Sequence, residues 1–180
     1  IGIFRGDNID DIPHLYVGHS KNGVNFDIDP NPIHFVDKDG KPVADTCYQY
    51  DPRVIPLEGA YFIVWCDDLG GPAISIARTT DFKTFVKIDS PFLPYNRNGV
   101  LFPRKVNDKY LMLSRPSDSG HTAFGDIFLS ESKDLEYWGK HRLVARNGWE
   151  WWCNLKIGAG PVPIETDEGW LMLFHGVSLT

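Results

Sequence analysis

LYVGHSKNGVNF, at residues 15–26, is matched further along the chain by ISIARTTDFKTF at 74–85 and IFLSESKDLEYW at 127–138. Each segment is a strand-like run followed by Ser or Thr, a turn residue, and an aromatic residue four positions after that turn residue. The turn residues lie 59 and 53 positions apart: Asn22, Asp81 and Asp134. A repeat of this length, with several strands per unit, is typical of β-propeller blades.

A second series of strand-like runs keeps step with the first: YFIVWC from Tyr61, YLMLSR from Tyr110 and WLMLFH from Trp170. No stretch keeps a helical period for three turns, and Gly, Pro, Asn and Asp interrupt the chain every few residues. Two sandwiches fit this spacing less well, and the repeat is too long for one coil of a solenoid. The sequence therefore predicts an all-β fold of the propeller class.

Composition excludes several classes of protein. The 180 residues are 42% hydrophobic and 23% charged, which is ordinary for a globular domain with a sizeable core. The net charge of −6 argues against nucleic-acid binding, and no apolar run approaches the roughly 20 residues of a membrane span. The start of the chain has neither an initiator Met nor a signal-peptide pattern. Cys47, Cys66 and Cys153 fit neither a disulfide framework nor a metal-ligand spacing, so we expect reduced thiols.

Basic residues recur at one place in the second series. The fifth position after each leading aromatic holds Cys66, Arg115 and His175, and the short run IFR places Arg5 in the same register. Equivalent positions of a propeller lie around one axis, so these side chains should face a common centre.

The segments that precede the second series carry charged residues ahead of a proline. These are Asp51 before Pro52, Arg97 before Pro103, and Lys156 before Pro161. Together with the first set, they would line one central pocket: Arg5, Asp51, Arg97, Arg115, Lys156 and His175. Bringing several basic side chains together costs electrostatic free energy. The usual reason for such a cluster is that it binds an anionic ligand, such as a phosphate or a carboxylate. Each basic residue alone is more simply a surface charge, and His175 alone a core hydrogen-bonder, so the shared register carries the pocket prediction.

Asp51 lies in YQYDPRV, between aromatic residues and a proline. Partial desolvation would raise the pKa of its carboxyl, as a general acid requires, whereas nearby arginines would lower it. The alternative is that Asp51 pairs with Arg53 or caps a turn. The local sequence leaves both readings open.

Two further motifs are also ambiguous. Trp149, Trp151 and Trp152 in NGWEWWCN serve either sugar stacking or packing between blades, in a chain that is 13% aromatic. The loop SDSGHTAFGD, with His121, is a substrate-recognition loop or a plain hairpin. The chain has no GxSxG, HExxH or complete phosphate-binding P-loop motif, which argues against serine hydrolase, zinc and nucleotide chemistry.

Several strings resemble glycoside hydrolase family 130 over essentially the whole chain: YDPRV, RNGVLFPRK, LSRPSDSGHTAFGDIFLSES, DLEYWGKHR and NLKIGAGPVPIETDEGWLMLFHGV. Within that family they are most similar to the branch that acts on 4-O-β-D-mannosyl-D-glucose. The resemblance implies a five-bladed β-propeller of which residues 1–180 supply about three blades, as part of a single catalytic domain whose N-terminal segment and C-terminal blades lie outside this chain.

The resemblance also implies inverting phosphorolysis of a β-mannoside, which yields α-mannose 1-phosphate and glucose. It assigns the catalytic acid to Asp51, with the proton passing through the mannose 3-hydroxyl. The implied phosphate ligands are Arg97, Arg115, Lys156 and His175, and the implied sugar ligands are Arg5, Asn98, Asp118 and His121. The resemblance implies no metal and no cofactor. Inorganic phosphate takes part in the implied reaction as a co-substrate.

Two rival functions remain for this sequence: a β-mannoside hydrolase on the same fold, and a propeller that binds sugar without catalysis. An inverting hydrolase needs a second carboxylate to activate water, whereas a phosphorylase needs one acid and a cationic cradle. Glu131, Glu136, Glu150 and Glu165 lie outside the pocket register and are expected at strand ends or hairpins. A phosphorylase is expected in the cytoplasm, where its sugar phosphate is retained. The expected partners are disaccharide and phosphate, without nucleic acid or membrane, and the sequence leaves homo-oligomerisation open.

Overall fold

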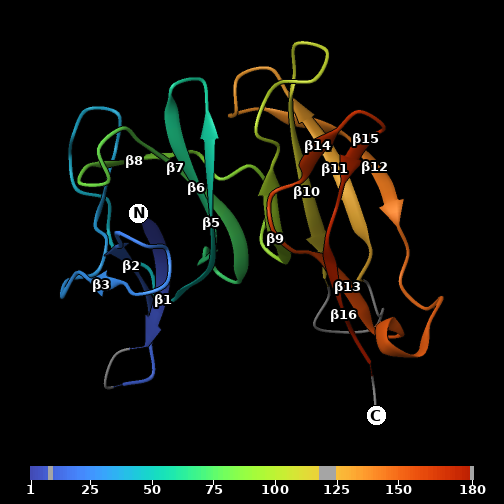
Figure 1. Ribbon diagram of the computed structural model, residues 1–180, viewed down its shortest axis with the longest axis horizontal. Helices are drawn as coiled ribbons and strands as arrows, with labels where there is room; N and C mark the ends of the chain where they lie inside the picture. The colour runs from blue at the N-terminus through green and yellow to red at the C-terminus, as the bar shows by residue number, and fades with distance from the viewer. Residues whose placement is uncertain (8–9, 118–124, 179–180) are drawn as a thin grey trace.

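A computed structural model describes residues 1–7, 10–117 and 125–178 of the chain. In these residues there are sixteen β-strands and one short 3₁₀ helix, η1 (Trp151–Cys153), so the all-β prediction is confirmed. The strands form two groups side by side, β1 to β8 and β9 to β16 (Figure 1).

Two complete antiparallel blades lie at the centre of the described chain. The second sheet has the order β4-β8-β7-β6-β5, in which β4 is added in parallel at the outer edge, and the third sheet has the order β12-β11-β10-β9. Their strands are β4 (Phe35–Val36), β5 (Gln49–Leu57), β6 (Ala60–Asp68), β7 (Pro72–Thr79), β8 (Phe85–Ile88), β9 (Asn96–Leu101), β10 (Tyr110–Pro116), β11 (Ile127–Ser132) and β12 (Trp138–Ala145).

Two smaller strand groups flank these blades. The first sheet has the order β1-β2-β3, and the last group consists of the pairs β13-β16 and β14-β15. Their strands are β1 (Gly2–Asp7), β2 (Pro13–His19), β3 (Asp27–Ile28), β13 (Lys156–Ala159), β14 (Ile164–Thr166), β15 (Gly169–Leu171) and β16 (Phe174–Val177). The predicted three blades' worth of chain is therefore divided into two complete blades and two partial ones.

The repeated sequence pattern forms the same turn three times, because each Ser or Thr and each Asn or Asp accepts backbone hydrogen bonds. In the second sheet, Thr79 Oγ1 accepts from Phe82 N at 2.9 Å, and Asp81 Oδ1 accepts from Lys83 N and Thr84 N at 2.9 Å. The same two acceptors appear at Ser20 with Asn22, and at Ser132 with Asp134. The repeat read from the sequence is thus a structural repeat, and each turn joins the last two strands of its sheet: β2 to β3, β7 to β8 and β11 to β12.

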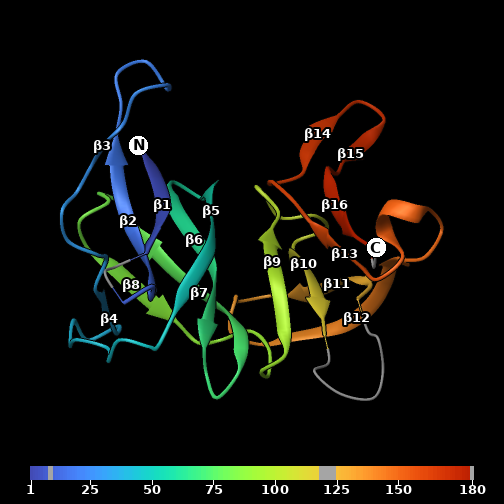
Figure 2. The ribbon, with the colours of Figure 1, turned by 90° about the horizontal axis from the view of Figure 1, so that it is seen from below.

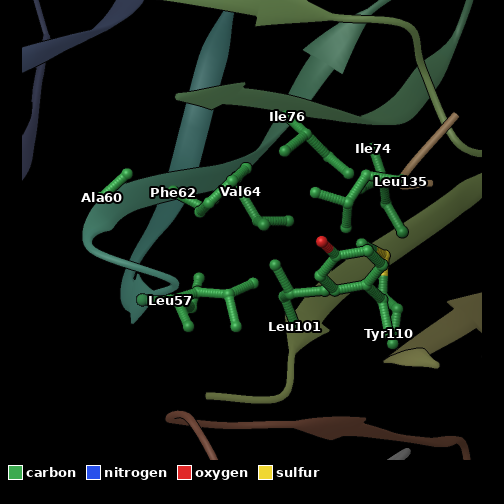
Figure 3. Packing of buried hydrophobic residues seen from close by; sticks show 11 residues of the cluster. Leu57, Ala60, Phe62, Val64, Ile74, Ile76, Leu101, Tyr110 and Leu135 are labelled. Atoms are coloured by element: carbon green, nitrogen blue, oxygen red, sulfur yellow. The ribbon is translucent and has the colours of Figure 1, made fainter. Parts of the chain in front are cut away.

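A continuous apolar core joins the two complete blades (Figure 3). Val64 and Ile74 of the second sheet and Leu101 of the third are fully buried in it. The sheets approach closely at Gly99, where an added Cβ would lie 2.6 Å from Ile74 and 2.8 Å from Val64. The run FIVW in β6 lacks polar alternation because Phe62 and Val64 face this core while Ile63 and Trp65 face the core toward the first sheet. No helix in the described residues is long and apolar enough to cross a membrane.

Candidate active site

Three inner strands, β5, β9 and β13, supply most of the candidate site. β9 lies between the other two and contacts both (Figure 2). The neighbouring strands β6, β10 and β16 place Cys66, Arg115 and His175 in one register, opposite Tyr50, Arg97 and Gly158 respectively. The predicted equivalence of the fifth positions is therefore confirmed.

The equivalence predicted for the inner strands is wrong in detail. The residue of β13 that corresponds to Arg97 is Gly158, and Lys156 lies two residues earlier at the start of the strand. Asp51 likewise follows Tyr50, the residue that corresponds to Arg97. These residues were matched by the proline that follows each of them, but that proline lies one, six and five residues later, so it does not mark equivalent positions. β5 and β9 each contain a bulge, whereas the pairing of β13 is regular.

The two bulges place Asp51 and Asn98 at matching positions. Both residues have left-handed backbones, with φ of 53° and 52°, in a region that non-glycine residues seldom adopt. Bulges redirect side chains, and such strain is concentrated at functional sites. Asp51 is exposed, and its carboxylate makes no hydrogen bond or ion pair with any residue that the structure describes. The alternative in which its carboxylate pairs with Arg53 is therefore not what the structure shows.

An open hollow surrounds Asp51, and we call it the Asp51 hollow. It is lined by Asp51, Pro52, Arg53, Asn98, Gly160, Pro161 and His175. Three of the predicted site residues, Asp51, Asn98 and His175, are thus brought together from three different sheets. Asn98 is only 7% exposed, so it forms part of the wall between the blades.

The other three predicted phosphate ligands are coupled electrostatically to one another or to His175. We call the four residues the basic cluster: Arg97, Arg115, Lys156 and His175. Burial first, and then the charge of Arg97, lower the pKa of Arg115. Burial, Arg115 and Arg97 lower the pKa of Lys156 in the same way. The pKa of His175 is lowered by burial and then by Arg115 and Arg53, and Asp51 acts in the opposite direction. The four basic groups therefore repel one another electrostatically, with Asp51 as a nearby opposite charge.

The two arginines of the cluster have hydrogen-bonding capacity left over. Arg115 is 5% exposed, yet its Nε has no partner within the described part of the chain, and its Nη1 makes a 3.5 Å bond to the carbonyl of Ile157. Arg97 Nε is also buried without a partner among these residues, and its Nη1 lies 3.5 Å from the Tyr50 hydroxyl. Buried donors without acceptors are costly, and an anion that accepts from both guanidinium groups would remove that cost.

Two residues that the sequence reasoning missed shape this cluster. A Cβ on Gly158 would lie 2.7 Å from the His175 ring and 2.8 Å from Arg115 Nη1, so only glycine lets these side chains meet across the strand. Arg53, from β5, reaches the carbonyls of Ala159 and Gly160 at the end of β13. A glycine within a strand was the available signal for the first. The second had no signal, because its partners lie more than a hundred residues away.

The other predicted sugar ligands are less closely associated with the hollow. Arg5 is exposed and forms a 2.9 Å ion pair with Asp7, and that hydrogen bond, followed by charges including that of Asp51, raises its pKa. It is not among the residues lining the hollow. Asp118 and His121 lie outside the described residues.

Part of the tryptophan motif has the packing role considered for it. Trp152 packs on Trp149 and Phe174 and lies against Gly176, so it serves packing. Trp151 is 77% exposed. Of the glutamates expected outside the pocket, Glu131 and Glu165 form surface ion pairs, with Arg142 and Arg104 respectively. Among the described residues, no group of three or more His, Cys, Asp or Glu could hold a metal ion.

Fold and site together define a β-propeller whose inner strands bring the carboxylate of Asp51 beside a cluster of basic groups. Comparison with known proteins refines this class. The model of glycoside hydrolase family 130, described as beta-1,4-mannooligosaccharide phosphorylase, matches residues 1–180. The chain belongs to this family, as its sequence motifs predicted.

Individual relatives agree with this assignment. The beta-1,4-mannooligosaccharide phosphorylase of Ruminococcus albus is 51% identical over 98% of this chain and 53% of its own length. The 4-O-beta-D-mannosyl-D-glucose phosphorylase of Bacteroides fragilis is 33% identical over 57% of this chain and 27% of its own length.

A solved structure is similar in fold as well as in sequence. It is the beta-1,2-mannobiose phosphorylase of Listeria innocua in complex with beta-1,2-mannobiose. Its TM-score is 0.81 at 30% identity, covering 93% of this chain and 46% of that one. The predicted five-bladed propeller class is confirmed. The chain spans about half the length of these relatives.

Proposed function

We propose that this chain carries the acid and the phosphate cradle of an inverting β-1,4-mannoside phosphorylase. In this reaction a phosphate oxygen attacks the anomeric carbon of mannose, the bond to the glycosidic oxygen breaks, and a proton is delivered to that oxygen. The products are α-mannose 1-phosphate and the acceptor sugar. Family membership and the names of the relatives support the reaction class.

The observation that carries the proposal is the excess of basic groups over carboxylates at the site. Among the residues that the structure describes, the buried Nε atoms of Arg97 and Arg115 have no acceptor, and Asp51 is the one carboxylate that lines the Asp51 hollow. A hydrolase of the inverting type would need a second carboxylate there to activate water. Phosphate brings its own negative charge, so one acid and a cationic cradle suffice for attack.

Asp51 is the proposed proton donor, acting through the mannose 3-hydroxyl. Its carboxylate has no hydrogen bond or ion pair with the residues that the structure describes, and its bulge directs it into the hollow that His175 also lines. Arg97, Arg115, Lys156 and His175 are the proposed phosphate ligands, and Asn98 and Arg5 are proposed to contact sugar. Asp118 and His121 remain proposed sugar ligands on the evidence of the sequence alone.

The acceptor is proposed to be mannose or a manno-oligosaccharide. The Ruminococcus relative, named for mannooligosaccharides, matches at higher identity and over more of this chain than the mannosylglucose relative. Glucose, the acceptor expected from the sequence motifs, is the second candidate. We also propose a cytoplasmic location, since the sugar phosphate is useful only where it is retained.

The test uses the protein at its full natural length with β-1,4-mannobiose and with mannosylglucose, each with and without phosphate. We expect α-mannose 1-phosphate only when phosphate is present, with the α-anomer identified by NMR. Free mannose without phosphate would support the hydrolase, and no turnover would support a binding protein. The ratio of kcat/KM for the two disaccharides decides the acceptor.

A further inference from the structure

Arg53 connects two inner strands that are not neighbours. Its Nε donates to the Gly160 carbonyl at 2.7 Å and its Nη2 to the Ala159 carbonyl at 3.0 Å, both at the end of β13. Its Nη1 donates to the Asp51 carbonyl at 3.0 Å, on its own strand β5. Each guanidinium nitrogen therefore holds a backbone carbonyl, and together they span β9, which lies between β5 and β13 (Figure 2).

The two ends of this connection carry different parts of the proposed machinery. On β5, the held carbonyl belongs to Asp51, whose left-handed backbone persists only if the surroundings fix it. On β13, the held carbonyls follow Lys156 and Gly158, and Gly158 is paired with His175. The guanidinium thus links the acid to the strand that carries Lys156 and pairs with the strand of His175.

We propose that Arg53 is a positioning residue that fixes the proton donor Asp51 relative to the phosphate-binding side chains of β13 and β16. It acts through backbone carbonyls, unlike Arg115, whose Nε has no partner in residues 1–7, 10–117 and 125–178. Only arginine presents donors in a rigid fork that can hold three carbonyls at once, and a lysine ammonium cannot replace it. This inference rests on the proposed function, which supplies the reacting groups that need alignment.

The test compares Arg53→Lys and Arg53→Met with Arg78→Lys, an exposed arginine of the same sheet, as the control. Misplacing reacting groups by about 1 Å can cost about 100-fold in rate, so we expect kcat to fall roughly 10- to 100-fold in both Arg53 variants. The KM for phosphate should rise and the KM for the disaccharide should stay within about twofold. Because charge alone would be retained by Lys, a Lys variant with unchanged kcat and phosphate KM overturns the proposal.

Hydrogen exchange separates failure of this inference from failure of the proposed function. In the Arg53 variants, amides of residues 49–54 and 156–160 should exchange faster than in the wild type, and the Arg78 control should not change. If the wild type shows no phosphate-dependent cleavage, the proposed function fails, and the hydrogen-exchange comparison alone tests whether Arg53 links β5 to β13. Unchanged exchange in both segments would overturn this role of Arg53.

A purely structural role for Arg53 predicts a different result. It would lower the melting temperature while the folded protein kept its kcat and phosphate KM, and that outcome also overturns the positioning role. If neither variant folds, the guanidinium protons of Arg53 in the wild type decide the question by NMR. Slow exchange of these protons with solvent supports the link to the carbonyls, and fast exchange contradicts it.

Discussion

Two clusters of buried charge lie in neighbouring sheets, and they differ in whether their charges are matched. In the second sheet, the fully buried Asp67 accepts from Lys87 Nζ and from Ser75 Oγ, both at 2.7 Å, and from Thr46 Oγ1. In the third sheet, Arg115 is 5% exposed, but its Nε has no partner among the described residues, and, after burial, the charge that most strongly lowers its pKa is that of another arginine, Arg97.

The difference separates a structural cluster from a binding one. A buried charge whose donors and acceptors are all satisfied stabilises a particular packing of the scaffold. A buried charge without a partner costs folding energy that a ligand can recover on binding. Substitutions in the first cluster should therefore change stability, and substitutions in the second should change the use of phosphate.

The largest effect is expected at the free carboxylate. Asp51→Asn should lower kcat by about 10²- to 10⁴-fold, because the amide cannot donate the proton that the leaving oxygen needs. Phosphate affinity should be kept or slightly improved, because the variant removes a negative charge beside the basic cluster. Steady-state kinetics and calorimetric phosphate binding measure both effects. Full activity in Asp51→Asn would remove Asp51 from the mechanism.

The next largest effect, on stability, is expected in the cluster whose charges are paired, that of Asp67 and Lys87. Lys87→Met should lower the free energy of unfolding by about 3–5 kcal/mol, because it leaves the buried Asp67 carboxylate without its counter-charge. Urea unfolding of the full-length protein measures this loss. The phosphate KM of the folded variant should stay within about twofold of the wild type, and a larger change would mean that the two clusters are not independent.

A smaller effect, on phosphate use and not on stability, is expected in the basic cluster, whose charges are not paired. Arg115→Met should raise the phosphate KM by about 10- to 100-fold, as expected for loss of a charge-assisted hydrogen bond. Without phosphate its melting temperature should equal or exceed that of the wild type, because burial and Arg97 already disfavour the charged form of Arg115. Thermal melting with and without phosphate is the measurement. Marked destabilisation without phosphate would place Arg115 with the scaffold.

The smallest effect tests the geometry between two members of that cluster. Gly158→Ala should raise the phosphate KM by about tenfold, because the added methyl would push the His175 ring and Arg115 Nη1 apart. Gly139→Ala, where an added Cβ meets nothing within 4 Å, is the matched control and should leave the phosphate KM unchanged. Equal kinetics in the two variants would mean that contact across Gly158 does not matter for phosphate.

The matched and unmatched clusters were unequally visible in the sequence. Arg115 and His175 were placed correctly because hydrophobic runs of regular spacing fix the register of a strand. Lys156 was assigned to the wrong position because the proline used to match the inner strands lies at a different distance from the equivalent residue of each strand. The Asp67–Lys87 pair was missed, since charged residues in strand-end positions look like ordinary surface charge.

The sequence by itself determined the blades and the family, because turn chemistry, strand periodicity and motifs are local properties of the chain. The local sequence left Asp51 between a candidate acid and a pair with Arg53, and the family resemblance assigned it the acid role. Only the tertiary structure decided that Arg53 holds backbone carbonyls and that the Asp51 carboxylate pairs with none of the described residues. Contacts between residues a hundred positions apart depend on how blades close around an axis, and that closure is set by packing of the whole domain.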